Sequence, residues 1–510
     1  MADQGNRKER RRQKKLAQKS PDAAFQNAWG LHQAGRLAEA EAAYGKILKG
    51  APDFFEANVN LGVVLQGQGK LEEALDAYKQ AIKINPDSPE IHFAFATALQ
   101  EMEQTVVAVA AYQRAVELKP DFVDALNGLA IALQTQGDAE NATKSFERAL
   151  EADPDNAETL NNLGTLYHKE ARLDDAMATY RRALDIRPDY AEAHRNLSHV
   201  LLLGGHLAEG WAESRWRWKA KDFPSEKRSF PSPIWNGEDI SGKTLLVWGE
   251  QGVGDEVHFA AMVPDLIGQG AAIVLECDRR LVALFERSFT QAACVARETP
   301  AAAEITSDID FQIPSGDLGG YLRPDFDSFP DKESYLIADG ARTAALKNQY
   351  QDGTDDLLVG IAWHSTNPDI GKEKSMSLMD WRPLAGLPGI RFIDLQYGDT
   401  SSERAEFEKQ TGVAVMHDDG VNQMKDLDAF AAQIAAMDLV ISVSNTTVHF
   451  AGALGVPTWV MLNTLPLPVW MLDRDDCPWH PSIRLFRQGQ KGEWSDVIGR
   501  VGEALKILKR

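Results

Sequence analysis

Small and apolar residues recur every 34 positions through residues 21–190. The recurring positions are an alanine (Ala40, Ala74, Ala108, Ala142, Ala176), an aromatic residue four positions later (Tyr44, Tyr78, Tyr112, Phe146, Tyr180) and a proline near the end of each unit (Pro52, Pro86, Pro120, Pro154, Pro188). Small residues let paired helices approach closely, the aromatic ring fills the gap to the next unit, and proline begins a new one. The pattern predicts five stacked helical pairs, followed by a degenerate sixth from Ala191 to Trp218.

This repeat resembles the tetratricopeptide repeat (TPR) in its period and in nearly every expected position. The resemblance implies an α superhelix over residues 21–218, with a concave face that binds a peptide or a protein. Asn60, Asn162 and Asn196 occupy one equivalent position of the first helix, and a carboxamide can both donate to and accept from a peptide backbone. We expect these three asparagines to bind peptide, as in the asparagine ladder of protein O-GlcNAc transferases, which they resemble. The alternative is that they are tolerated polar residues of the repeat.

The sixth repeat ends in a tryptophan-rich and then proline-rich stretch. Trp211, Trp216 and Trp218 lie among arginines, and the prolines that follow break regular structure. We expect Trp211–Gly242 to be the seam between the array and the next domain, with residues 219–242 as a linker. The aromatic rings there either cap the last repeat or form a platform for stacking on a sugar.

From Lys243 onward, short apolar runs alternate with helical segments. The predicted strands are Thr244–Trp248, Ala272–Glu276, Asp310–Pro314, Leu357–Trp363, Arg391–Leu395, Val413–Met416, Leu439–Val443 and Thr458–Leu462, and the predicted helices are Glu256–Gly268, Arg279–Arg287, Asp339–Asp356 and Asp426–Met437. Alternation of this kind favours parallel sheets with right-handed crossovers. We therefore predict two α/β units, residues 243–345 and residues 346–510.

Two loops in these units are typical of ligand sites. The glycine-rich loop Gly249–Asp255 follows the first strand, and the polar stretch 444–447 lies between the buried strand Leu439–Val443 and a helix that ends near Gly455. The N-terminus of that helix presents free N–H groups and a positive dipole end, which suits a phosphate. An ordinary βα turn with polar capping residues is the alternative.

Gly254-Asp255-Glu256-Val257-His258, together with the stretch from Thr446 to Pro457, resembles the heptosyltransferase-like family of GT-B glycosyltransferases across residues 240–505. The whole architecture is similar to bacterial repeat-linked glycosyltransferases, including those that glycosylate flagellin. The resemblance implies a GT-B type double Rossmann-like fold with Asp255 as general base. It also implies an acceptor loop (Gln251, Gly252, Gly254, His258) and a nucleotide-sugar site in the second unit (Lys372, Lys374, Ser375, Ser444, Asn445, Thr446, Thr447, His449).

No metal-binding motif is present in the sequence, so we expect cationic side chains and the helix N-terminus to neutralise the leaving phosphate. No cofactor is expected beside the nucleotide-sugar donor. The chain departs from the family at Ser444-Asn445, where the family has Asp-Thr. This departure favours the alternative of a degenerate transferase domain.

The chain of 510 residues carries a net charge of −21, and eight of its Lys and Arg residues lie within residues 1–20, which we interpret as a basic disordered arm. The acidity of the remainder argues against nucleic acid as the main partner. No apolar run approaches the about 18 residues of a membrane span. Because Cys277, Cys294 and Cys477 are scattered and no secretory signal is present, we expect a cytoplasmic protein.

The leading hypothesis is a metal-independent, inverting glycosyltransferase that moves a sugar from a nucleotide-sugar to a protein acceptor held by the array. Its most specific version has a flagellin-like Ser or Thr as acceptor. The alternatives are a non-catalytic repeat scaffold and a lipopolysaccharide-type glycosyltransferase.

Overall fold

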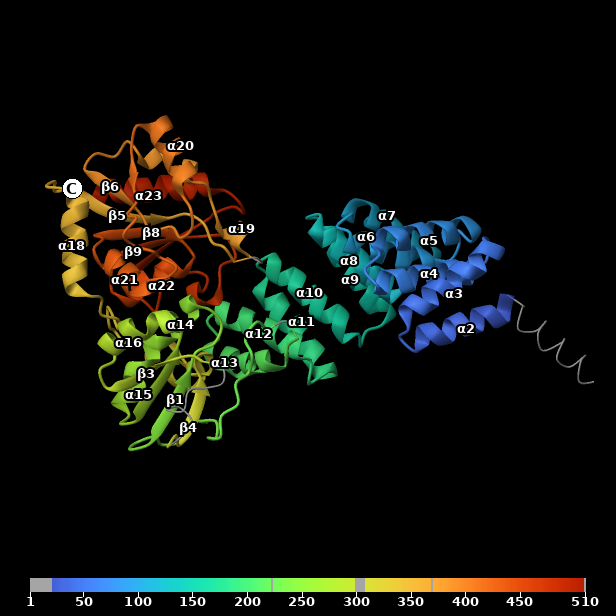
Figure 1. The fold of residues 1–510 in the computed structure, drawn as a ribbon, viewed down its shortest axis with the longest axis horizontal. Helices are drawn as coiled ribbons and strands as arrows, with labels where there is room; N and C mark the ends of the chain where they lie inside the picture. The colour runs from blue at the N-terminus through green and yellow to red at the C-terminus, as the bar shows by residue number, and fades with distance from the viewer. Residues whose placement is uncertain (1–20, 222, 299–307, 368–369, 509–510) are drawn as a thin grey trace, which may run out of the picture. The chain divides into compact units, whose positions relative to one another are not determined.

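A computed structural model describes residues 21–221, 223–298, 308–367 and 370–508 (Figure 1). The chain divides into two compact units, one up to Tyr190 and one from Ala191 onward. The basic arm expected at residues 1–20 lies outside the described residues.

The first unit consists of helical pairs. Its helices are α2 (Pro21–Gln33), α3 (Leu37–Gly50), α4 (Phe55–Gly67), α5 (Leu71–Ile84), α6 (Pro89–Glu101), α7 (Thr105–Leu118), α8 (Val123–Thr135), α9 (Ala139–Ala152), α10 (Ala157–Lys169) and α11 (Leu173–Ile186). The recurring prolines lie in the loops that lead from one pair to the next. The prediction of five helical repeats is confirmed.

Close packing of small residues against aromatic rings holds each pair together. Ala74 and Tyr78 are fully buried. A Cβ atom on Gly62 of α4 would lie only 2.3 Å from Cε1 of Tyr78 on α5. In the last pair of this unit, the corresponding distance from Gly164 to Cε1 of Tyr180 is 2.7 Å. Only glycine allows these rings to lie directly on the neighbouring helix backbone.

The sixth helical pair belongs to the second unit. It comprises α12 (Ala191–Leu203), α13 (Leu207–Ser214) and the 3₁₀ turn η1 (Arg215–Lys219). We expected the array to continue to residue 218, but Trp211 anchors this pair in the α/β region. The indole Nε1 of Trp211 donates to the carbonyl of Arg323 (3.1 Å), and a Cβ on Gly319 would lie 2.5 Å from the indole ring.

The next part of the second unit, which we call the first lobe, is built on a four-stranded parallel sheet of order β3-β2-β1-β4. Its strands are β1 (Thr244–Trp248), β2 (Ala272–Cys277), β3 (Ala292–Ala296) and β4 (Phe311–Pro314). Its helices are α14 (Val253–Phe259), η2 (Ala260–Met262), α15 (Val263–Gly268), η3 (Arg279–Leu281), α16 (Val282–Ser288), η5 (Ser315–Asp317), α17 (Gly319–Leu322) and η6 (Phe326–Ser328). The single helix expected over residues 256–268 is interrupted by the 3₁₀ turn η2, and α15 then begins at Val263 with Pro264 in its first turn.

The second lobe contains a six-stranded parallel sheet of order β10-β9-β8-β5-β6-β7. Its strands are β5 (Leu357–Ala362), β6 (Ile390–Asp394), β7 (Val415–Met416), β8 (Leu439–Val443), β9 (Thr458–Leu462) and β10 (Ile483–Arg487). Its helices are α18 (Gly340–Gln351), α19 (Gly371–Lys374), η7 (Leu378–Leu384), α20 (Ser401–Thr411), α21 (Leu427–Ala435), α22 (Thr446–Ala453), η8 (Pro468–Trp470) and α23 (Trp494–Leu508).

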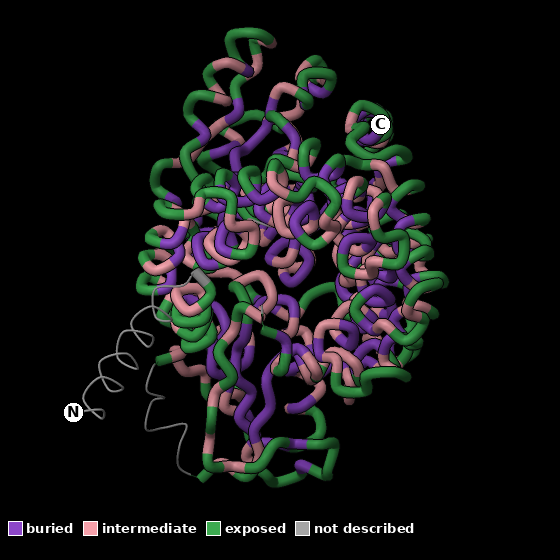
Figure 2. The backbone as a smooth tube through the Cα atoms, turned by 90° about the vertical axis from the view of Figure 1, so that its right-hand side faces the viewer, coloured by how far each residue is buried: buried purple, intermediate pink, exposed green. Residues whose placement is uncertain are grey.

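Strands β8 and β9 are buried along their whole length, as their uninterrupted apolar runs predict; Figure 2 colours the chain by burial. The α/β prediction is confirmed. The elements not predicted include the edge strands β3 and β10, the short helices α17 and α19, and the helices α20 and α23. Of these, α23 has a readable helical spacing in Val497, Val501 and Leu505. Within the described ranges, no helix is long and apolar enough to cross a membrane.

Candidate functional site

The two loops singled out in the sequence meet in the second unit, at the N-termini of α14 and α22. A Cβ on Gly254 would lie 3.3 Å from Oγ1 of Thr446 and 3.6 Å from Cδ2 of His449. A larger residue at 254 would push the two helices apart. Residues about 190 positions apart in sequence thereby form one site between the two lobes.

Asp255 lies in the first turn of α14, where its Oδ2 accepts a hydrogen bond from the Gly252 N–H (3.1 Å). The side chain is half-buried. Burial raises the pKa of Asp255 above its ordinary value, while the Gly252 N–H and the charge of Lys374 oppose the shift. A carboxylate with a raised pKa accepts a proton more readily, so Asp255 is suited to act as a base.

Lys374 ends the short helix α19 and is 6% exposed. Burial lowers the pKa of Lys374 to about 8, and the negative charge of Asp255 opposes this shift. The charge of Lys374 in turn contributes to the lowered pKa of His449. Lys374, Asp255 and His449 therefore share one electrostatic environment.

Lys372 and Ser375, which the sequence places with Lys374 in the predicted nucleotide-sugar site, have different surroundings from Lys374. Lys372 is exposed on α19. The hydroxyl of Ser375 donates to the carbonyl of Gly371 (2.6 Å) and accepts from the N–H of Ser365 (2.9 Å). Ser375 thus fixes the shape of the loop that carries Lys374.

The stretch 444–447 is held by hydrogen bonds within the lobe. Ser444 Oγ accepts from Nε1 of Trp470 (2.8 Å), and Asn445 Oδ1 caps α22 by accepting from the Thr447 N–H (3.0 Å). Asn445 Nδ2 also donates to the carbonyl of His364 (3.3 Å). Ser444 and Asn445 are therefore engaged in bonds within the lobe, and the Thr447 N–H is used by the cap. The hydroxyl and N–H of Thr446, in the first turn of α22, face the Gly254 loop.

Three histidine rings lie together beside this helix pair: His258 on α14, His449 on α22 and His480 in the segment before β10. Burial lowers the pKa of His449 to about 4 and that of His480 to about 3, and it holds the pKa of His258 well below its ordinary value. All three rings are neutral at pH 7. His480 lies outside both motifs, so sequence reasoning missed it.

A cavity of about 350 Å³ opens at this point of the second unit. Gln251, Asp255 and His258 line it from the first lobe and His449 lines it from the second. Leu207 and Trp211 of the sixth helical pair contribute an apolar wall. Two of the four predicted acceptor-loop residues, Gln251 and His258, therefore line a cavity that the sixth pair helps to enclose, whereas Gly252 and Gly254 do not.

A buried ion network attaches the sixth pair to the loop before α14. Arg217 of η1 forms two hydrogen bonds with the carboxylate of Glu250 (2.9 and 2.6 Å) and a third with Asp317 Oδ1 (2.6 Å). Glu250 also accepts the Gly316 N–H (2.7 Å). Sequence reasoning missed this network, because residues 217, 250 and 317 are joined only by the fold.

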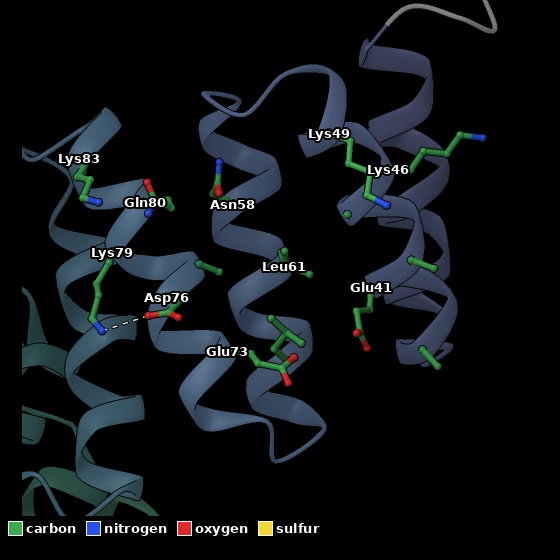
Figure 3. A pocket seen from close by; sticks show the side chains of 15 residues that line it. Glu41, Lys46, Lys49, Asn58, Leu61, Glu73, Asp76, Lys79, Gln80 and Lys83 are labelled. Atoms are coloured by element: carbon green, nitrogen blue, oxygen red, sulfur yellow. Dashed lines mark hydrogen bonds and ion pairs between the residues drawn. The ribbon is translucent and has the colours of Figure 1, made fainter.

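The first unit has a separate groove of about 1060 Å³ between α3, α4 and α5 (Figure 3). It is lined by both signs of charge: Lys46 and Lys49 of α3 lie on one side, and Asp76 and Lys79 form an ion pair on α5 (3.2 Å). The asparagine that lines this groove is Asn58.

The predicted peptide-binding asparagines are all half-buried. Asn60 Nδ2 donates to the carbonyl of Glu56 within α4 (2.8 Å). Asn162 lies on α10, whereas Asn196 lies on α12 in the second unit. The structure therefore places the three asparagines on helices of two different units.

Comparison with known proteins identifies the repeats. Residues 121–189 match a family model described as "Tetratricopeptide repeat", and residues 67–103 match one described as "TPR repeat". The N-terminal unit is a tetratricopeptide-repeat array. Similar solved structures include MamA (TM-score 0.31, 22% identity, 32% of this chain and 96% of that one). Another is YrrB, a TPR protein with an unusual peptide-binding site (TM-score 0.32, 26% identity, 36% of this chain and 94% of that one).

Among curated proteins, FlbA of Caulobacter vibrioides (strain ATCC 19089 / CIP 103742 / CB 15) is 36% identical over 324 residues. The match covers 60% of this chain and 54% of FlbA, so the chain spans about half the length of that relative. Because the match is longer than the array, it includes part of the second unit.

Proposed function

We propose that the second unit is a glycosyltransferase that moves a sugar from a nucleotide-sugar to a hydroxyl of a protein acceptor. The observation that carries this proposal is the meeting of Gly254 with Thr446 and His449, which brings Asp255 and the N-terminus of α22 to one site. Two parallel-sheet lobes with a ligand site between them are compatible with the GT-B type fold that the motifs resemble.

Asp255 acts as the general base in this proposal. It takes the proton of the acceptor hydroxyl as the acceptor oxygen forms its bond to the anomeric carbon of the sugar. The bond from that carbon to the phosphate oxygen breaks on the opposite face, so the configuration inverts. The buried Lys374 and the first N–H groups of α22 stabilise the negative charge that develops on the departing nucleoside diphosphate.

The array supplies the acceptor. Tetratricopeptide-repeat folds bind peptides and proteins, and the groove between α3, α4 and α5 is large enough for an extended segment. In the second unit, the apolar wall of Leu207 and Trp211 would guide the acceptor segment toward Asp255. We propose a Ser or Thr of a flagellin-like protein as the acceptor, in the cytoplasm, where nucleotide-sugars are made.

The test is a transfer assay on the full chain with a panel of nucleotide-sugars and purified flagellin, followed by intact-mass analysis of the acceptor. Asp255→Asn keeps an oxygen for the Gly252 N–H but removes the base, so we expect transfer to fall about 100- to 10,000-fold. Asp331→Asn, an exposed change in the same unit, serves as the control. Transfer by Asp255→Asn at the wild-type rate would refute the role of Asp255.

A non-catalytic repeat scaffold is the second candidate, favoured by the structural bonds that occupy Ser444 and Asn445. In that case no nucleotide would raise the melting temperature of the full chain, and no sugar would be transferred. A nucleotide that raises the melting temperature would exclude this candidate.

A further inference from the structure

The histidine cluster has the arrangement of a metal site. The ring centres of His258 and His449 lie 5.5 Å apart, those of His258 and His480 5.9 Å, and those of His449 and His480 6.3 Å. The three interplanar angles are 65°, 61° and 60°. The rings are therefore close to one another but neither stacked nor coplanar.

Two of these rings have a buried nitrogen atom without the partner that a buried imidazole usually has. His258 is 6% exposed and His480 1%. Nδ1 of His258 and Nδ1 of His449 are buried without a hydrogen-bond partner, whereas the His480 ring lies against the backbone of Gly452, which raises its pKa slightly against the effect of burial. Buried polar groups are nearly always paired, and an unpaired one indicates a site for a water or an ion, or a functional role. Two other histidines show the ordinary case: His92 contacts the carbonyl of Pro86 (2.8 Å), and His417 contacts Asp394 (2.9 Å).

Aromatic side chains hold the three rings in place. Trp479 lies 4.3 Å from His258, Trp470 stacks on His449 at 21°, and Tyr335 stacks on His480 at 22°. The hydroxyl of Tyr335 donates to the carbonyl of Val257 in α14 (2.9 Å), which fixes that ring in turn. The apolar surroundings keep the imidazoles neutral, so each offers a nitrogen lone pair without first losing a proton.

We propose that His258, His449 and His480 bind a zinc ion. Zn²⁺ bonds to imidazole nitrogen at about 2.0–2.1 Å, which places the ring centres of a three-histidine site about 5 Å apart. The observed separations exceed this only slightly, and one ligand atom from each ring lies within 4.8 Å of the others. In such a site the ligand nitrogen atoms are about 3.3 Å apart, so the rings would turn inward when the ion binds.

His258 and His449 also line the cavity, so an ion on these rings would lie beside it. The ion would join α14 of the first lobe to α22 and the segment before β10 of the second lobe. Three neutral imidazoles with no carboxylate or thiolate favour zinc over magnesium or calcium. The proposal goes beyond the proposed transferase function and does not depend on it, because the site is defined by ligand geometry alone.

The test uses the full chain without a histidine tag, freed of metal by chelator and dialysis. We expect zinc titration calorimetry and elemental analysis to give one equivalent per chain, and Co²⁺ to give the strong visible absorption of a four-coordinate site. His480→Asn and His258→Asn remove one ligand each. We expect each to weaken zinc binding more than about a hundredfold, since removing a group that merely orients a ligand already costs about 10- to 100-fold.

His92→Asn is the matched control, since His92 is a buried histidine outside the cluster, and it should bind zinc as the wild type does. Should a cluster variant fail to fold, as judged by circular dichroism, the wild-type titration and the Co²⁺ spectrum decide the question. Absence of stoichiometric zinc from the wild type would overturn the proposal, and so would folded cluster variants that bind zinc with wild-type affinity. Neither readout measures sugar transfer, so this proposal and the transferase function can fail separately.

Discussion

The array and the second unit bury different kinds of side chain. In the array, the core consists of alanines, aliphatic residues and the repeated aromatic ring, and ion pairs such as Arg36–Glu39 lie on the surface with both side chains more than half exposed. Among the residues that the structure describes, every buried Lys, Arg, Asp or Glu lies in the second unit. Arg217, Glu250 and Lys374 are examples.

This difference indicates different tasks. Burying a charge costs free energy unless it is paired, so a fold gains little stability from it. The array avoids the cost and keeps its charges at the surface, where they are available to a partner. The second unit accepts the cost, in part at Arg217, which lines the cavity, and in part in ion pairs elsewhere, such as Arg228–Glu276.

The largest expected difference between the two units is in the stability lost when a charged residue is replaced, and breaking the Arg217 network should show it. Arg217→Met leaves Glu250 buried without its cation, and we expect the free energy of unfolding of the second unit to fall by about 3–5 kcal/mol. Of the 12 tryptophans only Trp29 lies in the array, so tryptophan fluorescence in a urea titration reports the second unit almost alone. The matched change Arg36→Met in the array should have no resolvable effect. If Arg217→Met and Arg36→Met lowered the free energy of unfolding equally, the proposed difference between the two units in buried charge would be wrong.

Lys374 should show the next largest effect, on ligand affinity. Because its pKa is about 8 in the fold, it loses its charge as the pH rises through about 8, and affinity for a nucleoside diphosphate should fall there. Lys374→Met should weaken this affinity about 10- to 100-fold at pH 7, the usual range for a lost charged hydrogen bond. Calorimetric titration across pH measures both effects. Affinity independent of pH and of this substitution would exclude a phosphate role for Lys374.

The same group has a consequence for stability. The pKa of Lys374 is about 8 in the fold, whereas a lysine in an unfolded chain keeps the ordinary pKa of 10.5. Between these two pH values, Lys374 is neutral in the folded chain but protonated in the unfolded chain. The unfolded chain then binds more protons, so the contribution of this residue to the free energy of unfolding rises with pH in that window. This increase in the free energy of unfolding with pH should be absent in Lys374→Met. Urea denaturation of both proteins at several pH values would measure it.

The smallest expected effect concerns packing in the array. Gly62→Ala places a Cβ 2.3 Å from the Tyr78 ring, and we expect a loss of about 1–3 kcal/mol despite the better helix propensity of alanine. Gly30→Ala in α2, which meets no atom within 4 Å, should instead stabilise the array by up to about 1 kcal/mol. Thermal melts followed by circular dichroism compare the two. A Gly62→Ala variant as stable as Gly30→Ala would mean that the Tyr78 ring moves aside freely.

The sequence predicts the periodic parts of this molecule well, because each repeat obeys the same local packing rule. The ranges of β1, β8 and β9 were likewise readable from their apolar runs. What the sequence does not reveal are contacts that only the fold creates. The Arg217–Glu250 pair and the position of His480 beside His258 and His449 are examples, since each joins segments with no shared motif.

The ends of elements were also harder to predict than their presence. The first helix of the first lobe begins at Val253, three residues before the predicted start. Asp255 consequently lies within its first turn, where it serves both as a capping group and as a group of the site. A capping preference and a catalytic role select the same residue type, so sequence alone does not separate them.

Hydrogen exchange on the full chain, with and without nucleoside diphosphate-sugars from a panel, tests most directly whether the second unit alone binds the donor. We expect a bound donor to slow exchange at residues 253–256 and 444–449 and to leave residues 21–190 unchanged. Protection confined to the array, or no protection by any donor of the panel, would contradict a ligand site between α14 and α22.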